Sequence, residues 1–513
     1  MTRFNGIRAA FAALSLLAMG ACTYVPFDAP RTVSRATDPL GPSALASEAQ
    51  ADLAPYGGRS AFVPLSEGND ALGARLKMIE AAERSIDLQY FLIKPDLAGS
   101  LVSRALIDAA ERGVRVRFLL DDVFTTADDT QLALLDSFDN IEVRLFNPLS
   151  RNSIKAVNFL LDFNRVNRRM HNKSLTVDNA LSVVGGRNIA DEYFQIHTDA
   201  EFADFDMFVA GPAVQKITES FDRFWNDPRA VPVVNIVGAD TEAELRATLA
   251  DITTSASAAE RGIYRRAVNS QYIADFSAGR LDALVSANMV VSDSPDKLRQ
   301  PVPSADRRLY RALQDQMLKS EDSVLILTPY FVPRQSGVDF YAELERRGID
   351  VKVVTNSLAA TNHSYVHGGY AKYRKALLEA GVQLYEVRAD APQVLGDLPE
   401  GSDVKLTMHT KLAFFDDDRA FVGSLNFDPR SIEINSELGL FVALPADSEL
   451  TADLIRQRLA DYAYEVRLDA EGRLIWVYDN GRRRELLRSE PGAGALSKFV
   501  AGVTRILPVE GQL

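Results

Sequence analysis

The chain has 513 residues, of which 47% are hydrophobic and 25% charged, so it is long enough for more than one globular domain. Its net charge of −13 counts against general affinity for nucleic acid or anionic lipid, although a local basic cleft can still exist inside an acidic protein. A single cysteine excludes a disulfide framework.

The first 21 residues have the pattern of an export signal. Arg3 and Arg8 precede an apolar run at residues 9–19 that is too short to cross a bilayer comfortably. Removal of residues 1–21 takes away these two positive charges and shifts the net charge from −13 to −15. Cys22 follows a small-residue cleavage position and resembles the acylated cysteine of bacterial lipoproteins, which predicts a lipid-anchored, periplasm-facing protein of the cell envelope. The alternative is an ordinary cleaved signal with an incidental cysteine.

A flexible tether and a first α/β unit are expected next. Residues 22–60 are rich in Pro, Ala, Ser and Asp without clear periodicity, which favours a tether. In residues 61–230, apolar residues at helical spacing alternate with β-prone runs. The predicted helices are 71–84, 99–112 and 129–138, and the predicted strands are 85–93, 114–120 and 141–146.

The same order of elements recurs in residues 304–445. The predicted helices are 309–319, 338–347 and 370–380, and the predicted strands are 323–331, 349–355 and 382–387. Strands that alternate with helices imply mostly parallel sheets covered by helices. The chain is therefore predicted to be a tandem repeat of an α/β unit.

Two segments lie outside the repeats. Residues 231–303 are interpreted as a connector and subdomain. Residues 446–513 predict a helix at 451–462, a hairpin of 464–468 with 474–478, and an apolar tail at 496–509 with isolated basic residues. The tail has two interpretations, a helix that lies on a membrane and a packed terminal helix.

Each repeat carries the same reactive motif in a β-prone run. Its members are His171, Lys173 and Asp178 in the first repeat and His409, Lys411 and Asp416 in the second. Side chains two residues apart on a strand share a face, so each His and its Lys point the same way. If the halves pack face to face, two imidazoles and two ammonium groups converge. Such a site suits a phosphodiester, because the lysines neutralise its oxygens while one imidazole attacks phosphorus and the other protonates the leaving oxygen.

Further candidate residues follow each motif. Asp178 and Asp416 fall at turns, and we expect them to hold the hairpins rather than to touch the rings. Six residues later come 185–188 and 423–426, where glycines permit close backbone approach to a phosphate and Asn188 and Asn426 can donate to its oxygens. The equivalent acids Asp204 and Glu437 are candidates to orient the two rings; the alternative is that they are ordinary strand-end acids.

The doubled pattern His-x-Lys-x(4)-Asp-x(6)-Gly-[Gly/Ser]-x-Asn resembles that of the phospholipase D superfamily, and both copies match it without a gap. The resemblance extends to bacterial cardiolipin synthases of the C type. It rests on the stretches 87–90, 117–122, 167–173, 184–194, 369–374, 426–431 and 507–510. The resemblance implies a pseudo-twofold tandem of α/β/α sandwiches with mixed, mostly parallel sheets and one site formed by both halves. It also implies that His171 forms a phosphohistidine. His409 would then act as the acid toward the departing alcohol and as the base toward the incoming one.

The expected pocket has two more candidate residues. Alternation allows only one of the arginines before the first motif, Arg169, on the His171 face, and solvent is the alternative for its side chain. His367 lies in a stretch that resembles the C-type synthases and is a candidate for the headgroup pocket, although a helix-start histidine without that role is equally compatible. No His, Cys, Asp or Glu set has metal-ligand spacing, so neither a metal nor another cofactor is expected.

The function predicted from these features is transfer of phosphatidyl groups between membrane phospholipids. The leading reaction is cardiolipin synthesis from phosphatidylglycerol and a second phospholipid, with phosphatidylethanolamine as one candidate. In the main alternative, a phospholipase D, water resolves the phosphohistidine. A nuclease is disfavoured by the net charge of −15, and nucleic acid is not an expected partner. A lipoprotein that only binds phospholipid is disfavoured because every motif residue is present.

Overall fold

The fold is known from a computed structural model of the whole chain. The structure describes residues 23–37, 41, 43–126, 129–196, 200–237, 258–280, 283–395, 402–446, 448, 450–507 and 510–513. The expected signal peptide and Cys22 lie outside these residues. Within them, no helix is both long and apolar enough to cross a membrane.

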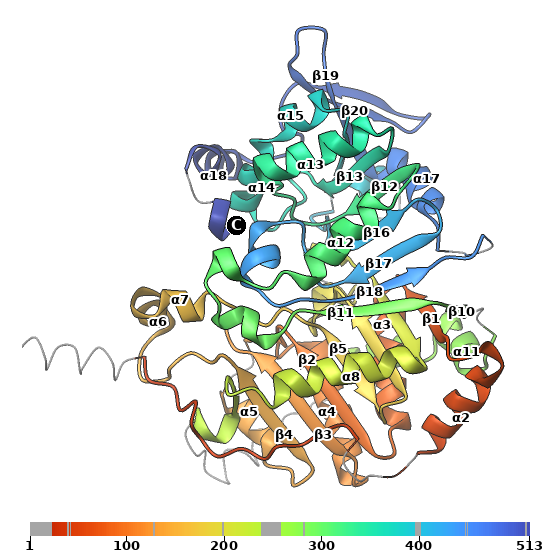
Figure 1. Cartoon of the computed structure of the whole chain (residues 1–513), viewed down its shortest axis with the longest axis vertical. Helices are drawn as coiled ribbons and strands as arrows, with labels where there is room; N and C mark the ends of the chain where they lie inside the picture. The colour runs from red at the N-terminus through yellow and green to blue at the C-terminus, as the bar shows by residue number, and fades with distance from the viewer. Residues whose placement is uncertain are drawn as a thin grey trace, which may run out of the picture.

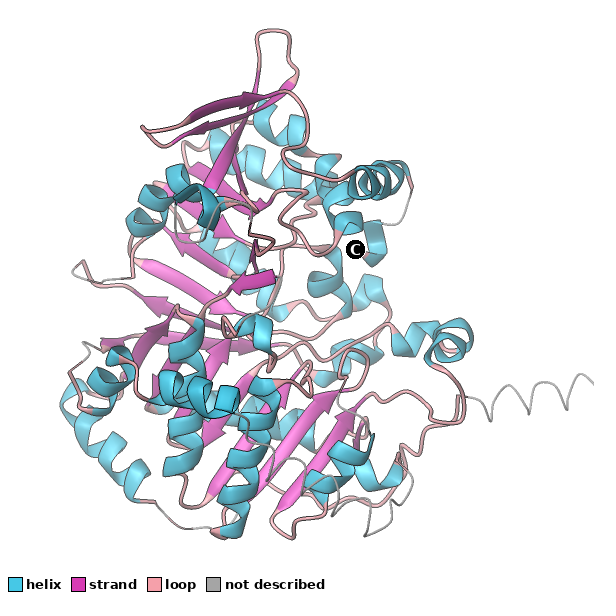
Figure 2. Cartoon of the chain, turned by 180° about the vertical axis from the view of Figure 1, so that it is seen from behind, coloured by secondary structure: helices cyan, strands magenta, loops and turns pink. Residues whose placement is uncertain are grey.

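The chain forms two halves, each built on a large sheet, and Figures 1 and 2 show them stacked along the long axis. The first sheet has the spatial order β10 (Leu284–Ser286), β1 (Ser60–Leu65), β8 (Asp206–Ala210), β6 (Leu181–Gly185), β5 (Ser174–Val177), β2 (Ser85–Tyr90), β3 (Arg115–Asp121), β4 (Ile141–Phe146) and β9 (Ala230–Pro232).

The second sheet repeats the central part of this order. It consists of β11 (Asn288–Ser292), β18 (Leu438–Ala443), β17 (Arg419–Gly423), β16 (Leu412–Phe415), β12 (Ser323–Leu327), β13 (Asp350–Asn356), β14 (Gln383–Val387), β19 (Ala463–Leu468), β20 (Leu474–Asp479) and β21 (Arg484–Leu487). Strands β8-β6-β5-β2-β3-β4 correspond to β18-β17-β16-β12-β13-β14, which confirms the predicted tandem α/β repeat.

One detail of the predicted sheets is wrong: they are mixed, but antiparallel pairs dominate. Only β2-β3-β4 and β12-β13-β14 pair in parallel among the described strands of these two sheets. The remaining neighbours are antiparallel. Helical crossovers supply only two parallel pairs per half, whereas each motif strand turns back as a hairpin and adds antiparallel neighbours.

Helices cover both sheets. In the first half these are α3 (Gly68–Ala81), α4 (Leu97–Glu111), α5 (Asp129–Asp136) and α8 (Pro212–Trp225). In the second half they are α12 (Arg308–Leu318), α13 (Arg334–Arg346), α14 (Ser364–Ala371), α15 (Arg374–Glu379) and α17 (Ala452–Tyr462). Each half has its own core, and a third apolar core is shared: Phe62 and Met207 of the first half belong to the same buried cluster as Phe414 and Leu440 of the second.

The segments outside the repeats are integrated into the halves. In the connector, α10 (Ala258–Val268) and α11 (Gln271–Ser277) pack against α3, while β10 and β11 extend one sheet each. The part of the expected tether at residues 23–37 is docked rather than flexible. Arg144 donates to Thr32 O at 2.6 Å and Arg117 to Ser34 O at 3.0 Å, because buried guanidinium groups need hydrogen-bond acceptors. Hydrophobic periodicity along the sequence does not reveal such acceptors.

At the boundary between the halves, backbone segments of one half pair with segments of the other. β7 (Ala200–Ala203) pairs in parallel with β15 (Lys405–Met408), and Met170 forms a parallel bridge with Ser436. Each motif segment therefore runs beside the segment that leads to the acid of the other half.

Candidate active site

The two His-Lys pairs lie in extended chain just before the hairpin strands β5 and β16 rather than inside them. The interhalf pairing holds them there: His171 N donates to Ser436 O at 3.0 Å, and His409 N donates to Ala203 O at 2.7 Å. All four side chains are buried, with residue exposures of 7% for His171 and 5% for His409. Both rings line one cavity, as the duplicated motif predicts.

Each imidazole is bonded to an acid from the opposite half. His171 Nδ1 lies 2.9 and 3.1 Å from the two carboxylate oxygens of Glu437, and His409 Nδ1 lies 2.6 Å from Asp204 Oδ2. The sequence identifies these two acids as candidates, but it does not reveal the crossed pairing. Because the carboxylate accepts the Nδ1 proton, Nε2 of each ring keeps the lone pair.

The electrostatics of the site match an anionic ligand. Burial lowers the pKa of His171 to about 4 and that of His409 to about 3, so both rings are neutral at pH 7. Burial also lowers the pKa of Lys173 to about 7 and that of Lys411 to about 8. Burial opposes ionisation of Glu437, but His171 and Lys173 outweigh it and hold its pKa below the ordinary value. The site thus keeps a carboxylate beside each ring and has two ammonium groups that a phosphate would stabilise.

Aromatic side chains fix the planes of the two imidazoles. The edge of Phe91 meets His171 with ring centroids 4.8 Å apart, and Phe202 stacks on His409 at 5.3 Å and 14°. Tyr193 meets His409 edge to face at 5.2 Å. Sequence reasoning missed these three residues, because an aromatic residue in a strand or loop carries no local signal that distinguishes a ring support from a core residue.

The cavity has a volume of about 460 Å³ and receives residues from both halves. Asn188 and Asn426 line it, as expected, and the side-chain oxygens of both have no partner among the described residues. Asn188 Nδ2 donates to Tyr193 Oη at 3.0 Å. The apolar part of the wall includes Phe91, Leu92, Val123, Phe124, Phe159, Val166, Phe202, Val366 and Leu513. The cavity therefore combines polar groups for a phosphodiester with an apolar lining.

The two other pocket candidates have different outcomes: Arg169 lies in the cavity lining as expected, and His367 does not. Arg169 lines the cavity, but its guanidinium donates to Asp121 Oδ2 at 2.9 Å and to backbone carbonyls, so it is already neutralised. His367 does not line the cavity; it contacts Arg374 in a separate buried cluster. His363, at the start of α14, lines the cavity instead. The structure thus corrects the assignment of His367 to the pocket, because the chain before α14 is not helical and turns His363 inward.

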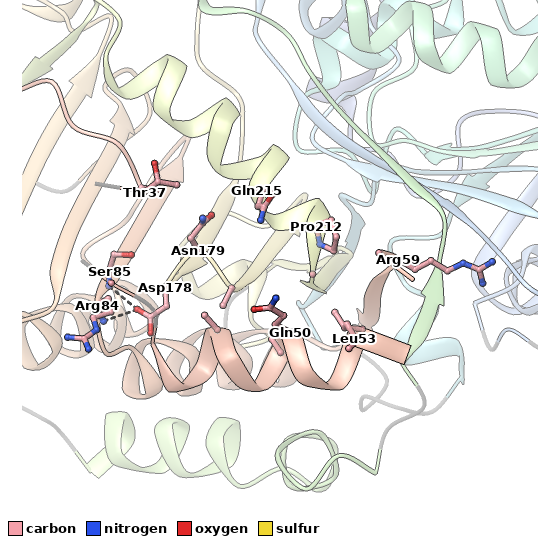
Figure 3. A pocket seen from close by; sticks show the side chains of 18 residues that line it. Thr37, Gln50, Leu53, Arg59, Arg84, Ser85, Asp178, Asn179, Pro212 and Gln215 are labelled. Carbon is pink, nitrogen blue, oxygen red and sulfur yellow. Dashed lines mark hydrogen bonds between the residues drawn. The ribbon is translucent and has the colours of Figure 1, made fainter. Parts of the chain in front are cut away.

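The motif aspartates lie outside the cavity. Asp178 Oδ1 accepts from the backbone N–H groups of Arg84 at 2.8 Å and Ser85 at 2.9 Å (Figure 3). Asp416 Oδ1 accepts in the same way from the N–H groups at the start of β12. Both residues have left-handed backbone, with φ of 51° and 52°. They belong to the reactive motif but do not touch the rings, and the expected hairpin-holding geometry is present: Asp178 ties its turn to the start of β2, and Asp416 ties its turn to the start of β12.

Ser424 is a further residue of the site that the sequence did not single out. Its hydroxyl donates to the Glu437 carboxylate and is in turn bonded by Leu438 N at 3.0 Å. Its counterpart in the first half is Gly186, where an added Cβ would lie 2.2 Å from Asp204 Oδ1. The second position of the Gly-[Gly/Ser] element thus lies against the ring-orienting acid in both halves. The shared Gly-[Gly/Ser] element is the sequence feature from which this role could have been predicted.

One cluster of metal-ligating groups was not anticipated. His367, Glu386 and Glu490 have ligand atoms within 4.8 Å of one another. Arg374 already pairs with Glu386 at 2.8 Å and with Glu490 at 2.6 Å, so a guanidinium occupies the position between these carboxylates. The cluster fits a buried ion-pair network better than a cation site.

Comparisons with known proteins agree with the geometry. The family model described as "Cardiolipin synthase, PLD-like domain" matches residues 76–225 and 313–459, one match per half. Cardiolipin synthase C of Escherichia coli K12 is 36% identical over 89% of this chain and 97% of its own length. Cardiolipin synthase 1 of Bacillus cereus is 24% identical over 81% of this chain and 69% of its own length. The crystal structure of phosphatidylserine synthase from Haemophilus influenzae superposes with a TM-score of 0.56 at 13% identity, covering 91% of this chain and all of that one, and so shares the fold. The chain belongs to the cardiolipin synthase family of proteins with phospholipase D-like domains.

Proposed function

We propose that the protein is a transphosphatidylase that acts on membrane phospholipids through a phosphohistidine, and that its main product is cardiolipin. The observation that carries the proposal is the crossed site: two neutral imidazoles at one cavity, each bonded to a buried acid from the other half, with a lysine beside each ring. The family and its named relatives support the substrate class.

In the first step, His171 Nε2 attacks phosphorus and the bond from phosphorus to the leaving alcohol breaks. His409 Nε2 donates its proton to the departing oxygen. Lys173 and Lys411 stabilise the charge that develops on the non-bridging oxygens. The anion of the bound phosphodiester favours the protonated form of His409 and so raises its pKa from the low value in the empty site, which is the direction that an acid in this step requires.

In the second step, the acceptor hydroxyl gives its proton to His409, its oxygen attacks phosphorus, and the P–N bond to His171 breaks. With a phosphatidylglycerol hydroxyl as acceptor, the product is cardiolipin. With water as acceptor, the product is phosphatidic acid, and this phospholipase D reaction is the second candidate. The apolar lining of the cavity favours an acyl-bearing acceptor over water.

The location and domain organisation are also proposals. Acylation of Cys22 after removal of residues 1–21 would hold the protein on the periplasmic side of a membrane, where its substrates reside. The units are the halves at 61–230 and 304–445, joined by 231–303 and followed by 446–513.

A product assay tests the reaction. The purified protein is incubated with phosphatidylglycerol, with and without phosphatidylethanolamine, and the lipids are separated. Cardiolipin is expected; phosphatidic acid alone means hydrolysis, and cleavage of DNA with no lipid product would refute the proposal.

Trapping the covalent intermediate tests the roles of the two histidines. His171→Asn should abolish the phospho-enzyme, whereas His409→Asn should let it form and persist, because the base that activates the acceptor is missing. Equal trapping in both variants would show that the assignment is wrong.

A further inference from the structure

Helix α18 (Ala495–Ile506) turns its small residues inward and its large apolar residues outward. Ala501 and Thr504 are buried against Gly368 of α14, where an added Cβ would lie 2.5 Å from Ala501 O. The exposed stripe consists of Leu496 at 76%, Phe499 at 67%, Val503 at 40% and Ile506 at 85%. A surface helix of a soluble protein normally buries its large apolar side chains and exposes its small and polar ones. The reversed arrangement in α18 is typical of a surface that contacts an apolar partner.

A second exposed apolar group lies on α6 (Lys155–Leu161), α7 (Phe163–Val166) and the residue before them. It consists of Ile154 at 73%, Leu160 at 80%, Leu161 at 42% and Phe163 at 44%. Figure 1 and the opposite view in Figure 2 both place α6, α7 and α18 on the same side of the molecule, although they come from different halves.

The lining of the catalytic cavity includes residues of the elements beside both groups. Phe159 of α6 and Val166 of α7 line the cavity from the first half. Tyr365 lines it from the second half and belongs to α14, the helix against which α18 packs. Two lining residues are themselves exposed apolar residues, Phe124 at 54% and Tyr365 at 45%. We call α6, α7, α18, Phe124 and Tyr365 together the mouth face.

The charges of the mouth face are basic, in contrast to the acidic chain. Helix α18 carries Lys498 and Arg505 and no acidic residue, and α6 carries Lys155 as its only charged residue. The acid between α6 and α7, Asp162, is paired with Arg165 at 2.5 Å. Basic residues beside exposed apolar ones complement the surface of an anionic bilayer.

The start of the described chain also lies at the mouth face. The guanidinium of Arg165 in α7 lies 5.4 Å from the ring centroid of Phe27, and Tyr24 is 58% exposed. Figure 1 shows this first segment beside α7. The described chain therefore begins next to the mouth face.

We infer that the mouth face docks on an anionic phospholipid bilayer, so that the catalytic cavity opens directly into the headgroup layer. This inference rests on the proposed action on membrane phospholipids. A diacyl lipid then reaches His171 by moving laterally and tilting its headgroup upward, and its acyl chains stay in the bilayer or against the apolar wall of the cavity. Transfer of a whole lipid into water, which would expose its acyl chains to solvent, is thereby avoided.

Vesicle binding tests the mouth face. The full mature chain carrying Cys22→Ser is sedimented with vesicles of equal parts phosphatidylglycerol and phosphatidylcholine, so that an acyl anchor does not mask the face. Phe499→Ser combined with Ile506→Ser should lower the partition coefficient about tenfold or more, because two large apolar groups no longer leave water. Ile154→Ser with Leu160→Ser should do the same.

Controls separate a lipid surface from other occupants. The matched pair Leu318→Ser and Leu486→Ser removes exposed leucines, 43% and 55% exposed, from α12 and β21, which are not part of the mouth face, and should leave binding unchanged. Lys498→Gln with Arg505→Gln should weaken binding to vesicles with phosphatidylglycerol but not to pure phosphatidylcholine. Unchanged vesicle binding by the mouth-face variants would overturn the inference. A changed oligomeric state as their only effect would also overturn it, and would indicate that a second copy of the chain covers the mouth face.

Turnover distinguishes failure of docking from failure of the proposed reaction. On monomeric short-chain phosphatidylglycerol, the mouth-face variants should keep wild-type activity, whereas on vesicles they should lose about as much activity as binding. His171→Asn should lose both. If the mouth-face variants lost equal activity on both substrates, the docking role would be refuted. If the wild type bound vesicles through the mouth face but turned over no lipid, only the proposed reaction would be refuted.

Discussion

The crossed pairing of rings and acids can be tested by removing one charge without changing shape. Glu437→Gln keeps the size of the side chain beside His171 but removes the carboxylate that holds Nδ1 at 2.9 Å. As Nε2 bonds to phosphorus, the ring becomes cationic. A pair of unit charges about 4 Å apart at an effective dielectric of about 20 interacts by about 4 kcal/mol. Loss of most of this interaction should slow phospho-enzyme formation by about 10²- to 10³-fold.

The assay is rapid quenching with phosphatidylglycerol labelled in its phosphate. Glu437→Gln should show slow formation of labelled protein and no accumulation, because the affected ring is His171. Asp204→Asn should instead accumulate labelled protein, because it weakens His409, which must activate the acceptor. The opposite pattern would refute the reasoning, since it would mean that each acid serves the ring of its own half.

A matched control separates this effect from loss of a buried carboxylate in general. Asp87 is 2% exposed and pairs with Arg117 at 2.7 Å, away from the cavity lining. Asp87→Asn should lower the melting temperature without changing the ratio of formation to breakdown of the phospho-enzyme. If it reproduced the Glu437→Gln kinetics, the slow step would reflect folding rather than the orientation of His171.

Three further expectations follow from the site. Lys173 and Lys411 are charged only below their pKa values of about 7 and about 8, so kcat/KM should fall as pH rises through this range, and a profile that stays flat to pH 9 or so would contradict the lowered values. Asp178→Ala removes an acceptor of three backbone N–H groups and should lower the free energy of unfolding by about 2–4 kcal/mol in a denaturant titration, while kcat per folded molecule stays near wild type. Gly186→Ala should shift Asp204 and mimic Asp204→Asn in phospho-enzyme accumulation, whereas wild-type breakdown kinetics would show that the carboxylate can move aside without consequence.

Much of the fold and the centre of the site could be predicted because their signals are local. Helical and strand periodicities show the two α/β units, and the doubled motif selects His171, Lys173, His409 and Lys411. The turn positions of the motif aspartates also predicted their hairpin contacts. The parallel character of the sheets was overestimated, because periodicity identifies a strand but not the direction of its neighbour.

The amino-acid sequence by itself determined which side chains are duplicated, and therefore which chemistry the chain can carry. The tertiary structure alone decided which acid meets which ring, since Glu437 and His171 are 266 residues apart and Asp204 and His409 are 205 apart. It also decided that His363 rather than His367 faces the cavity, and that α18 presents its large side chains outward. The physical reason is that these contacts depend on how two complete halves pack through a shared core, and no spacing within either half encodes that packing.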